Sequence, residues 1–170
     1  DLVLKLRTFS RLDEGELKFV KIEESIEAVI TLLQHRLQDR IRLTRKYGAI
    51  KVVACYPGPL NQVIMNVLSN AIDAIEGKGE ITIATGKDDS MLFIAITDTG
   101  KGIPAAIRER IFEPFYTTKP VGQGTGLGLS ISYGIIQRHK GVLAVQSEEG
   151  KGTTVIIRIP LNPGGTKDHG

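Results

Sequence analysis

The sequence predicts an α/β fold, a two-layer sandwich in which helices cover one face of a mixed, mostly antiparallel β-sheet. Two amphipathic stretches, residues 23–37 and 60–77, repeat apolar side chains at helical spacing. Alternating runs come in pairs around turn sequences, at 80–87 with 91–98 and at 142–147 with 153–159. Because most strands sit in hairpins, the sheet should be mixed and not doubly wound, with the helices on one face.

The first part of this fold reads as a strand, a helix and two further strands. LKFVKI at residues 17–22 alternates like a strand and precedes the helix at 23–37. IRLTRKYG (41–48) and IKVVACY (50–56) then alternate again. Gly48 marks a turn between these two runs, so we predict that they form a strand pair.

A long helix, a hairpin and an open loop follow. Gly77 and Gly79 end the helix predicted at 60–77. The hairpin over 80–98 ends in DTGKGIP, where Pro104 suits the first turn of a short helix. Residues 113–126 show no period and are rich in Gly, Pro and Thr, which predicts an open loop. A further helix and the last hairpin complete the order of elements.

The composition excludes several function classes. The net charge is +3 and the basic residues are scattered, so no stripe could neutralise many nucleic-acid phosphates. The single cysteine, Cys55, excludes an internal disulfide framework and a multi-cysteine metal site. No apolar run approaches 18 residues and no signal peptide begins the chain, which predicts a cytoplasmic domain. A full-length protein anchored in a membrane is compatible with this composition.

The chain is expected to divide into three segments. Residues 1–13, DLVLKLRTFSRLD, carry apolar side chains at helical spacing but are too few to form a stable helix alone. We interpret residues 1–14 as the end of a preceding helix with its linker, or as a docked arm. Residues 15–161 have the length of one globular domain, and residues 162–170 form a polar tail.

Two asparagines form the first candidate site. Asn66 and Asn70 lie four residues apart on the predicted long helix, so their side chains point to the same side. Amide oxygens are neutral ligands that suit a hard cation which keeps waters and phosphate oxygens in its shell. Alternatively, one or both side chains cap or bridge to a neighbouring loop.

The hexapeptide DTGKGI, residues 98–103, is the second candidate site. Asp98 ends an apolar strand, where a carboxylate can accept a hydrogen bond from the exocyclic amine of a flat base. Glycines directly after it, Gly100 and Gly102, let the backbone approach such a ring closely. Because Asp and Gly are also the usual turn residues, an ordinary turn is the alternative.

IFEPFYTTK, residues 111–119, is the third candidate site. The ring of Phe115, with that of Phe112, would anchor the start of a loop. Thr117, Thr118 and Lys119 then supply hydroxyls and a cation, and the lysine would meet phosphate as a point charge. The alternative is a solvated loop with an aromatic anchor.

The nonapeptide GQGTGLGLS, residues 122–130, is the fourth candidate site. Gly124, Gly126 and Gly128 lie in the loop and the first turn of the helix beyond it. Unpaired amides at a helix start attract anions, and glycine lets a phosphate approach them. Leu127 and Leu129 would hold this turn onto the core. The pattern matches neither the Walker loop nor the dinucleotide fingerprint, and a flexible hinge is the alternative.

Taken together and in this order, the four motifs resemble those of sensor histidine kinases. NQVIMNVLSNAIDA, DTGKGIP, IFEPFYTTK and GTGLGLS are similar to the N, first glycine, F and second glycine boxes of their catalytic domain. That domain belongs to the wider group of gyrase, heat-shock chaperone, histidine kinase and MutL ATPases. The wording of the motifs most resembles the nitrogen-regulation branch, and the resemblance covers roughly residues 15–160.

The resemblance implies an ATP-binding catalytic domain over residues 15–161, with ATP between the long helix and a lid. It implies that Asn70 binds Mg²⁺, that Asn66 assists there, and that both serve catalysis. It implies that Asp98 reads the adenine amino group and that Thr153 joins its water network. The ATP-binding residues that it implies are Asn66, Asn70, Asp73, Asp98, Gly100, Gly102, Ile103, Phe115, Thr117, Thr118, Lys119, Gly124, Thr125, Gly126, Leu127, Gly128, Leu129 and Thr153.

Two departures from the family pattern refine this expectation. None of the histidines, His35, His139 and His169, lies in a phosphoacceptor motif such as His-Glu-Leu-Arg-Asn-Pro. Many relatives also have a lysine near Ala74, although the nitrogen-regulation branch often lacks it. We therefore expect ATP binding with little or no autophosphorylation, because the accepting histidine would lie on a separate helical-hairpin domain.

The expected partners follow from the same resemblance. They are the protein's own dimerisation and histidine phosphotransfer domain and the receiver domain of a response regulator, with no nucleic acid. We expect this chain to be a monomer and the full-length protein a homodimer. Two alternatives stay open: a degenerate nucleotide-sensing or docking module, and a serine-directed anti-sigma-factor kinase of the same superfamily.

Overall fold

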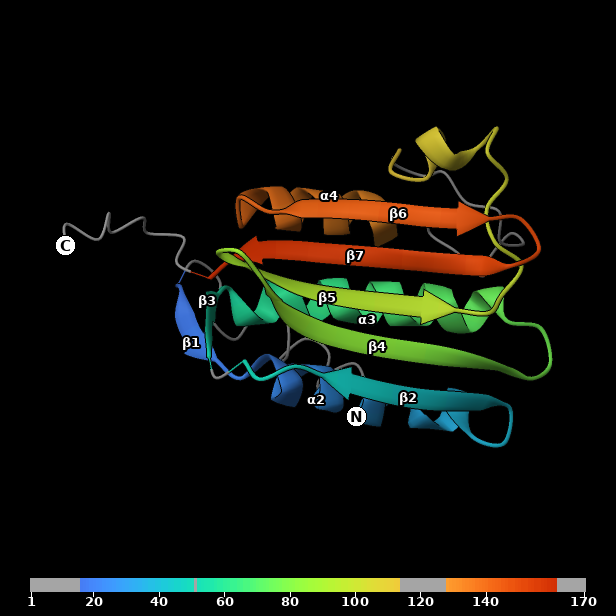
Figure 1. The fold of residues 1–170 in the computed structure, drawn as a ribbon, viewed down its shortest axis with the longest axis horizontal. Helices are drawn as coiled ribbons and strands as arrows, with labels where there is room; N and C mark the ends of the chain where they lie inside the picture. The colour runs from blue at the N-terminus through green and yellow to red at the C-terminus, as the bar shows by residue number, and fades with distance from the viewer. Residues whose placement is uncertain (1–15, 51, 114–127, 162–170) are drawn as a thin grey trace.

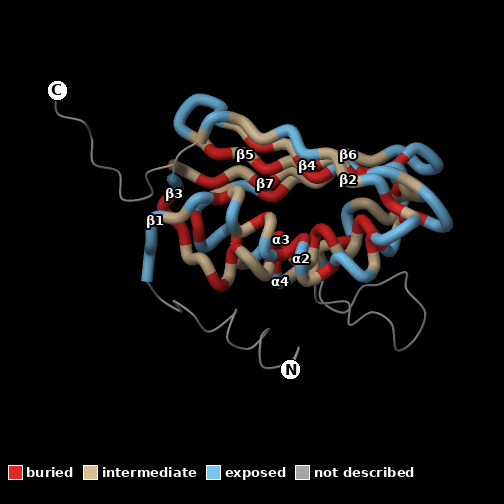
Figure 2. Tube along the Cα trace, turned by 90° about the horizontal axis from the view of Figure 1, so that it is seen from below, coloured by how far each residue is buried: buried red, intermediate tan, exposed pale blue. Residues whose placement is uncertain are grey.

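A mixed five-stranded sheet with helices on one face forms the main body of the fold, as the sequence predicts (Figure 1). The computed structural model describes residues 16–50, 52–113 and 128–161. The strands of the main sheet lie in the order β2 (Ile41–Tyr47), β4 (Gly79–Asp88), β5 (Met91–Asp98), β7 (Gly152–Pro160) and β6 (Val142–Glu148). The helices are α2 (Ile22–Leu37), α3 (Pro57–Ala74) and α4 (Gly128–Arg138). Seen from the edge, the sheet and the helices form two layers (Figure 2).

The core lies between these two layers and is mostly aliphatic. Every second residue of the central strands points to the helices, so Ile81 and Ile83 of β4 and Ile94 and Ile96 of β5 are almost completely buried. Burying one such side chain contributes about 1.5–3 kcal/mol to the free energy of folding. The helices contribute buried residues at helical spacing to the same core, such as Ile64 of α3. The alternation and the helical stripes predicted from the sequence therefore meet in one core.

Both predicted hairpins are present. β4 pairs antiparallel with β5, and the turn between them has Asp89 in the left-handed region at φ 54°. β6 pairs antiparallel with β7, and β7 also pairs with β5. This second pairing places Asp98, the last residue of β5, opposite Thr153 at the start of β7. Two candidate residues that are far apart in the sequence are thereby neighbours.

The predicted strand pair around Gly48 is wrong in its pairing. β2 lies parallel to β4 in the main sheet, whereas β3 (Val53–Cys55) pairs antiparallel with β1 (Lys18–Val20) in a separate two-stranded sheet. The amide of Gly48 donates to the carbonyl of Thr85 (2.9 Å), so the chain leaves β2 while still bound to β4. Long-range pairing, and not the local turn, thus decides where each strand goes.

Helix boundaries also differ from the prediction. α3 begins at Pro57 and not at residue 60, because proline is tolerated in the first turn, where amides have no partner within the helix. It ends at Ala74, since Ile75 is already extended (φ −92°, ψ 118°). The short helix expected at Pro104 is the 3-10 helix η1 (Arg108–Arg110), and Pro104 only accepts a turn hydrogen bond from Ile107 (3.1 Å).

Candidate functional site

A buried carboxylate lies at the end of β5. Asp98 is only 5% exposed, and the amide of Gly100 donates to its Oδ1 atom (2.8 Å). Burial raises the pKa of the Asp98 carboxyl, while the backbone amides of Gly100 and Thr153 oppose that rise by hydrogen bonding. These two amides fix the orientation of the carboxylate. Its remaining acceptor positions suit a donor such as an exocyclic amine.

The two glycines after Asp98 are required by close packing. A Cβ atom on Gly100 would lie 2.5 Å from the carbonyl oxygen of Ala74, in the last turn of α3. Gly102 adopts φ +71°, and a Cβ atom there would lie 2.1 Å from the carbonyl oxygen of Glu148. The loop after Asp98 is therefore held between the end of α3 and the β6–β7 turn. Sequence reasoning found these glycines but assigned their role only to the approach of a ligand.

Ser147 of β6 organises the surroundings of Asp98, and sequence reasoning missed it. Its hydroxyl accepts from the amide of Ile103 (2.8 Å), donates to the carbonyl of Gly152 (3.0 Å) and lies 2.8 Å from the hydroxyl of Thr153. Its carbonyl accepts from the guanidinium of Arg108. The only sequence signal is a serine whose register in the last hairpin places it opposite Thr153. Ser147 thus joins the predicted residues Ile103 and Thr153 in one network.

The second part of the candidate site lies where α3 meets the start of α4. The side-chain amide of Asn66 donates to the carbonyl of Gly128 (3.1 Å) and to the hydroxyl of Ser132 (3.2 Å). Asn70 lies one turn further along α3 and is half-buried. Gly128 is the first residue of α4, and Leu129 beside it is half-buried. The amides of this first turn are the kind of helix start that attracts anions.

α3 connects the two parts of the candidate site. It contacts α4 through Asn66 and the loop after Asp98 through Ala74, whose carbonyl accepts from the amide of Lys101 (3.0 Å). These two contact points are eight residues apart, which corresponds to about 12 Å along a helix. The same helix therefore passes a carboxylate suited to a base at one end and a helix start suited to phosphate at the other.

Other predicted residues are placed differently or lie outside the described residues. The carboxylate of Asp73 forms an ion pair with Arg36 of α2. The predicted N-terminal helix remnant and the polar tail are not among the described residues, and neither is the loop at 114–127. That loop contains the candidate residues Phe115, Thr117, Thr118, Lys119, Gly124, Thr125, Gly126 and Leu127.

Comparison with known proteins identifies the family. Residues 56–163 match the family model described as histidine kinase-, DNA gyrase B- and HSP90-like ATPase. The chain belongs to this ATPase family. The match begins at the N-terminus of α3 and includes Asn66, Asp98 and Gly128, so the two parts of the candidate site lie within this ATPase domain.

Within the ATPase family, the relatives are histidine kinases. The chain is 34% identical over 98% of its length to the signal transduction histidine-protein kinase AtoS of Escherichia coli, and 42% identical over 78% to the sensor histidine kinase ZraS of the same organism. It spans only 28% and 30% of the lengths of these two proteins. Both fit the nitrogen-regulation-like branch that the motifs predicted.

Solved histidine kinase structures share the fold. The catalytic domain of histidine kinase ThkA superposes with a TM-score of 0.79 at 31% identity, covering 88% of this chain and 98% of that domain. A second structure, of ThkA in complex with the response regulator protein TrrA, gives a TM-score of 0.76 at 26% identity and covers 96% of this chain and 47% of that one. This chain is therefore the ATP-binding catalytic domain of a two-component sensor histidine kinase. Among the described residues, no helix is long and apolar enough to cross a membrane.

Proposed function

We propose that this ATPase domain holds ATP along α3, with adenine at Asp98 and the triphosphate at the start of α4. The observation that carries the proposal is the Asp98 carboxylate, which is buried and oriented by the backbone amides of Gly100 and Thr153. A carboxylate fixed in this way favours binding of a ligand whose N–H group donates a hydrogen bond to it, because a buried acceptor without a partner is costly in free energy. The distance of about 12 Å between the two contact points of α3 is of the order of a nucleotide's length.

Mg²⁺ would be held by Asn66 and Asn70. The amide nitrogen of Asn66 is engaged with Gly128 and Ser132, which orients its oxygen away from α4. Within the described residues, no group of three His, Cys, Asp or Glu side chains could hold a metal ion. Two neutral amides fit a cation that arrives with the triphosphate and completes its shell with phosphate oxygens and water. When bound, Mg²⁺ would supply neutralisation of the phosphate charge.

The reaction that we propose is transfer of the γ-phosphoryl group to a histidine on a separate helical-hairpin domain. A P–N bond forms while the bond from the γ-phosphorus to the bridging oxygen breaks, and ADP leaves. The chain's own contribution is to bind and orient the nucleotide and to exclude water. Lys119 and the neighbouring residues of the proposed lid would cover the phosphates.

The proposed partners follow from this reaction. In the full-length homodimer, the histidine would belong to the protein's own dimerisation domain, and a response-regulator receiver domain would accept the phosphate next. ThkA, whose catalytic domain has a similar fold, has been solved in complex with the response regulator protein TrrA. We propose that residues 1–14 form the end of the domain that precedes residues 15–161. Since ATP is the proposed substrate, we place this domain in the cytoplasm.

Calorimetry tests the binding part of the proposal. The parent chain should bind ADP and a non-hydrolysable ATP analogue, with a Mg²⁺-dependent gain for the analogue. Asp98→Asn replaces one of the two acceptor oxygens by an NH₂ group, which then faces either the Gly100 amide or the adenine amine, donor against donor. We expect a loss of affinity of about 30- to 100-fold, the equivalent of about 2–3 kcal/mol. A parent chain that binds neither nucleotide rules out the proposed function.

A mixing experiment tests the transfer. The chain is combined with radiolabelled ATP and a separately produced hairpin domain of a related kinase that carries the phosphoacceptor histidine. Label should appear on the hairpin as an acid-labile, base-stable phosphohistidine, and replacing that histidine by Gln should abolish it. Label that resists acid on a serine would support the serine-directed alternative. Tight ATP binding without label on any cognate hairpin would support a degenerate sensing module.

A further inference from the structure

The C-terminal end of α3 is capped by another part of the chain. A helix leaves its last four carbonyls without partners inside the helix. α3 has no basic residue in its last turn, and the chain becomes extended at Ile75. The carbonyls of this end nevertheless need donors, because the helix terminates against the loop that follows Asp98.

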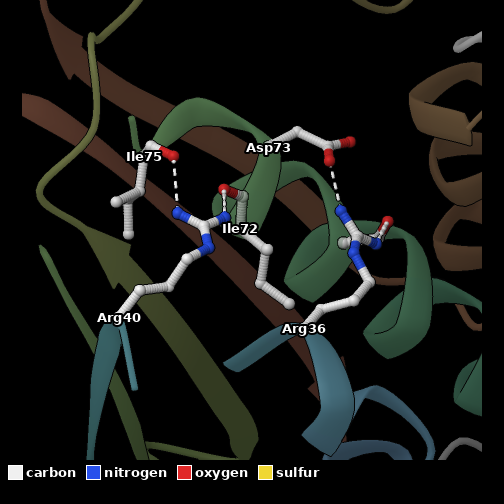
Figure 3. Close-up of polar contacts among 6 residues, drawn as sticks. Arg36, Arg40, Ile72, Asp73 and Ile75 are labelled. Carbon is white, nitrogen blue, oxygen red and sulfur yellow. Dashed lines mark hydrogen bonds and ion pairs between the residues drawn. The ribbon is translucent and has the colours of Figure 1, made fainter. Parts of the chain in front are cut away.

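Arg40, in the turn between α2 and β2, supplies these donors, and Arg36 in the last turn of α2 lies beside it on α3 (Figure 3). The guanidinium of Arg40 donates to the carbonyls of Ile72 (3.2 Å), Ile75 (2.9 Å) and Gly77 (2.9 Å). Arg36, four residues before Arg40 and still within α2, donates to the hydroxyl of Ser69 (2.8 Å) and forms an ion pair with Asp73. Both cations lie at the negative end of the α3 dipole, where positive charge is stabilising.

The backbone of Arg40 fixes the exit from α3 as well. Its carbonyl accepts from the amide of Gly79 (2.9 Å), the first residue of β4. The chain from Ile72 to Gly79 therefore wraps around this one residue, with hydrogen bonds from both its side chain and its backbone. Displacing the guanidinium would remove one hydrogen bond from each of three carbonyls in a segment of eight residues, although the Ile72 carbonyl would still accept from the amide of Ile75 (3.2 Å).

The segment held by Arg40 contacts the adenine end of the proposed nucleotide site at two points. Ala74, between the capped residues, accepts from the amide of Lys101 (3.0 Å) and leaves no room for a side chain at Gly100. Glu80, just beyond Gly79, exchanges hydrogen bonds with Thr99 through its amide (2.9 Å) and its carbonyl (3.1 Å). Both residues that follow Asp98 are thus fixed by a segment that itself depends on Arg40.

We propose that Arg40 is a positioning residue of the nucleotide site. It sets the end of α3 and the α3–β4 connection, and through them the loop 98–102 against which adenine would lie. The inference rests on the proposed function. Lysine could not fully replace Arg40, because only the planar guanidinium presents several donors in fixed directions to separate carbonyls. Arg40 lies in no motif and acts across 32 to 37 residues of sequence.

The test compares Arg40→Ala and Arg40→Lys with the parent and with Arg45→Ala. Arg45 is a matched control because it is an arginine of the adjoining strand β2 whose guanidinium pairs with Glu27 of α2 instead of donating to the carbonyls at the end of α3. Calorimetry at a temperature well below the Tm of each variant measures the affinities for non-hydrolysable ATP and GTP analogues. Hydrogen exchange is followed at the amide of Lys101 without nucleotide.

Arg40→Ala should lower the affinity for the ATP analogue about tenfold and reduce the ratio of the affinities for the ATP and GTP analogues. The Lys101 amide should exchange at least about tenfold faster, because its acceptor on Ala74 is no longer fixed. Arg40→Lys should fall between parent and alanine, and Arg45→Ala should match the parent in affinity and in Lys101 exchange, whatever its Tm.

Each failure points to one conclusion. If Arg40→Ala lowers the Tm but keeps the parent's affinity, base preference and Lys101 exchange, Arg40 is only a helix cap and the inference is overturned. If the parent binds no nucleotide, the proposed function fails, and Lys101 exchange alone decides whether Arg40 positions the loop. Should Arg40→Ala not fold, Arg40→Lys decides: parent-like affinity and exchange overturn the inference.

Discussion

Replacing Gly102 by alanine should destabilise the fold far more than its backbone angle alone would suggest. Gly77 provides the matched comparison, since its φ of +68° is nearly that of Gly102 at +71°. A Cβ atom on Gly77 would meet nothing within 4 Å. Gly77→Ala should therefore lose only about 1 kcal/mol, the left-handed strain of an L-residue partly offset by a less flexible unfolded chain.

Gly102→Ala adds a steric conflict with backbone that cannot move freely. The new Cβ atom would lie 2.1 Å from the carbonyl oxygen of Glu148 and 3.0 Å from the Cα atom of Glu149. Hydrogen bonds on both sides of Gly102, from Gly150 to Lys101 (2.6 Å) and from Ile103 to Ser147 (2.8 Å), prevent the loop from simply moving away. Overpacking of this kind costs about 1–3 kcal/mol, which brings the total to about 2–4 kcal/mol.

Urea unfolding of both variants and the parent measures the difference directly. The midpoint of Gly102→Ala should shift about two to four times as far as that of Gly77→Ala, at an unchanged dependence of free energy on urea. Gly102→Ala should also weaken binding of the ATP analogue, since the loop that follows Asp98 is displaced. Equal losses of stability in the two alanine variants would refute the reasoning from the Glu148 contact.

Two further predictions concern buried polar groups. Burial, aided by the charge of Arg138, lowers the pKa of His139 from its ordinary 6.5, although the carbonyl of Ile135 opposes this. The unfolded chain therefore binds a proton at a pH where His139 of the folded chain stays neutral. The free energy of unfolding should fall as the pH drops below about 6.5, by up to about 1.4 kcal/mol per pH unit. His139→Gln should reduce this dependence of the unfolding free energy on pH between pH 5 and 8, and an unchanged dependence would contradict the prediction. Ser147→Ala leaves the amide of Ile103 without its acceptor and should cost about 1–3 kcal/mol in thermal or urea unfolding. Ser90→Ala on the exposed β4–β5 turn should stay within about 0.5 kcal/mol of the parent, and equal losses at both serines would count against the Ser147 network.

Local periodicity was enough to predict the helices, the two hairpins and the α/β class. Ile81, Ile83, Ile94 and Ile96 alternate because a strand places every second side chain on one face, a rule that needs no knowledge of distant residues. Asp98 could also be found in this way, as a carboxylate at the end of an apolar run followed by glycines. Its ligand could be inferred only with the help of the family resemblance.

Segments without a local signal could not be placed from the sequence. The run containing β2 looks the same whether it pairs with β3 or with β4, and only the fold puts it parallel to β4. The pairing is decided by which arrangement buries Ile41 and the three residues of β3 at the same time. Such a choice depends on all the elements together.

The sequence by itself therefore determined the elements of this protein, its family and the residue types of its candidate site. The tertiary structure alone decided which residues support that site. Ser147 reaches Ile103 across 44 residues, and Arg40 reaches the end of α3 across 32 to 37. The physical reason is that periodicity and turn chemistry act between near neighbours. Hydrogen bonds from side chains to distant backbone carbonyls and amides are instead made by whichever side chain the packing of distant segments brings within about 3 Å.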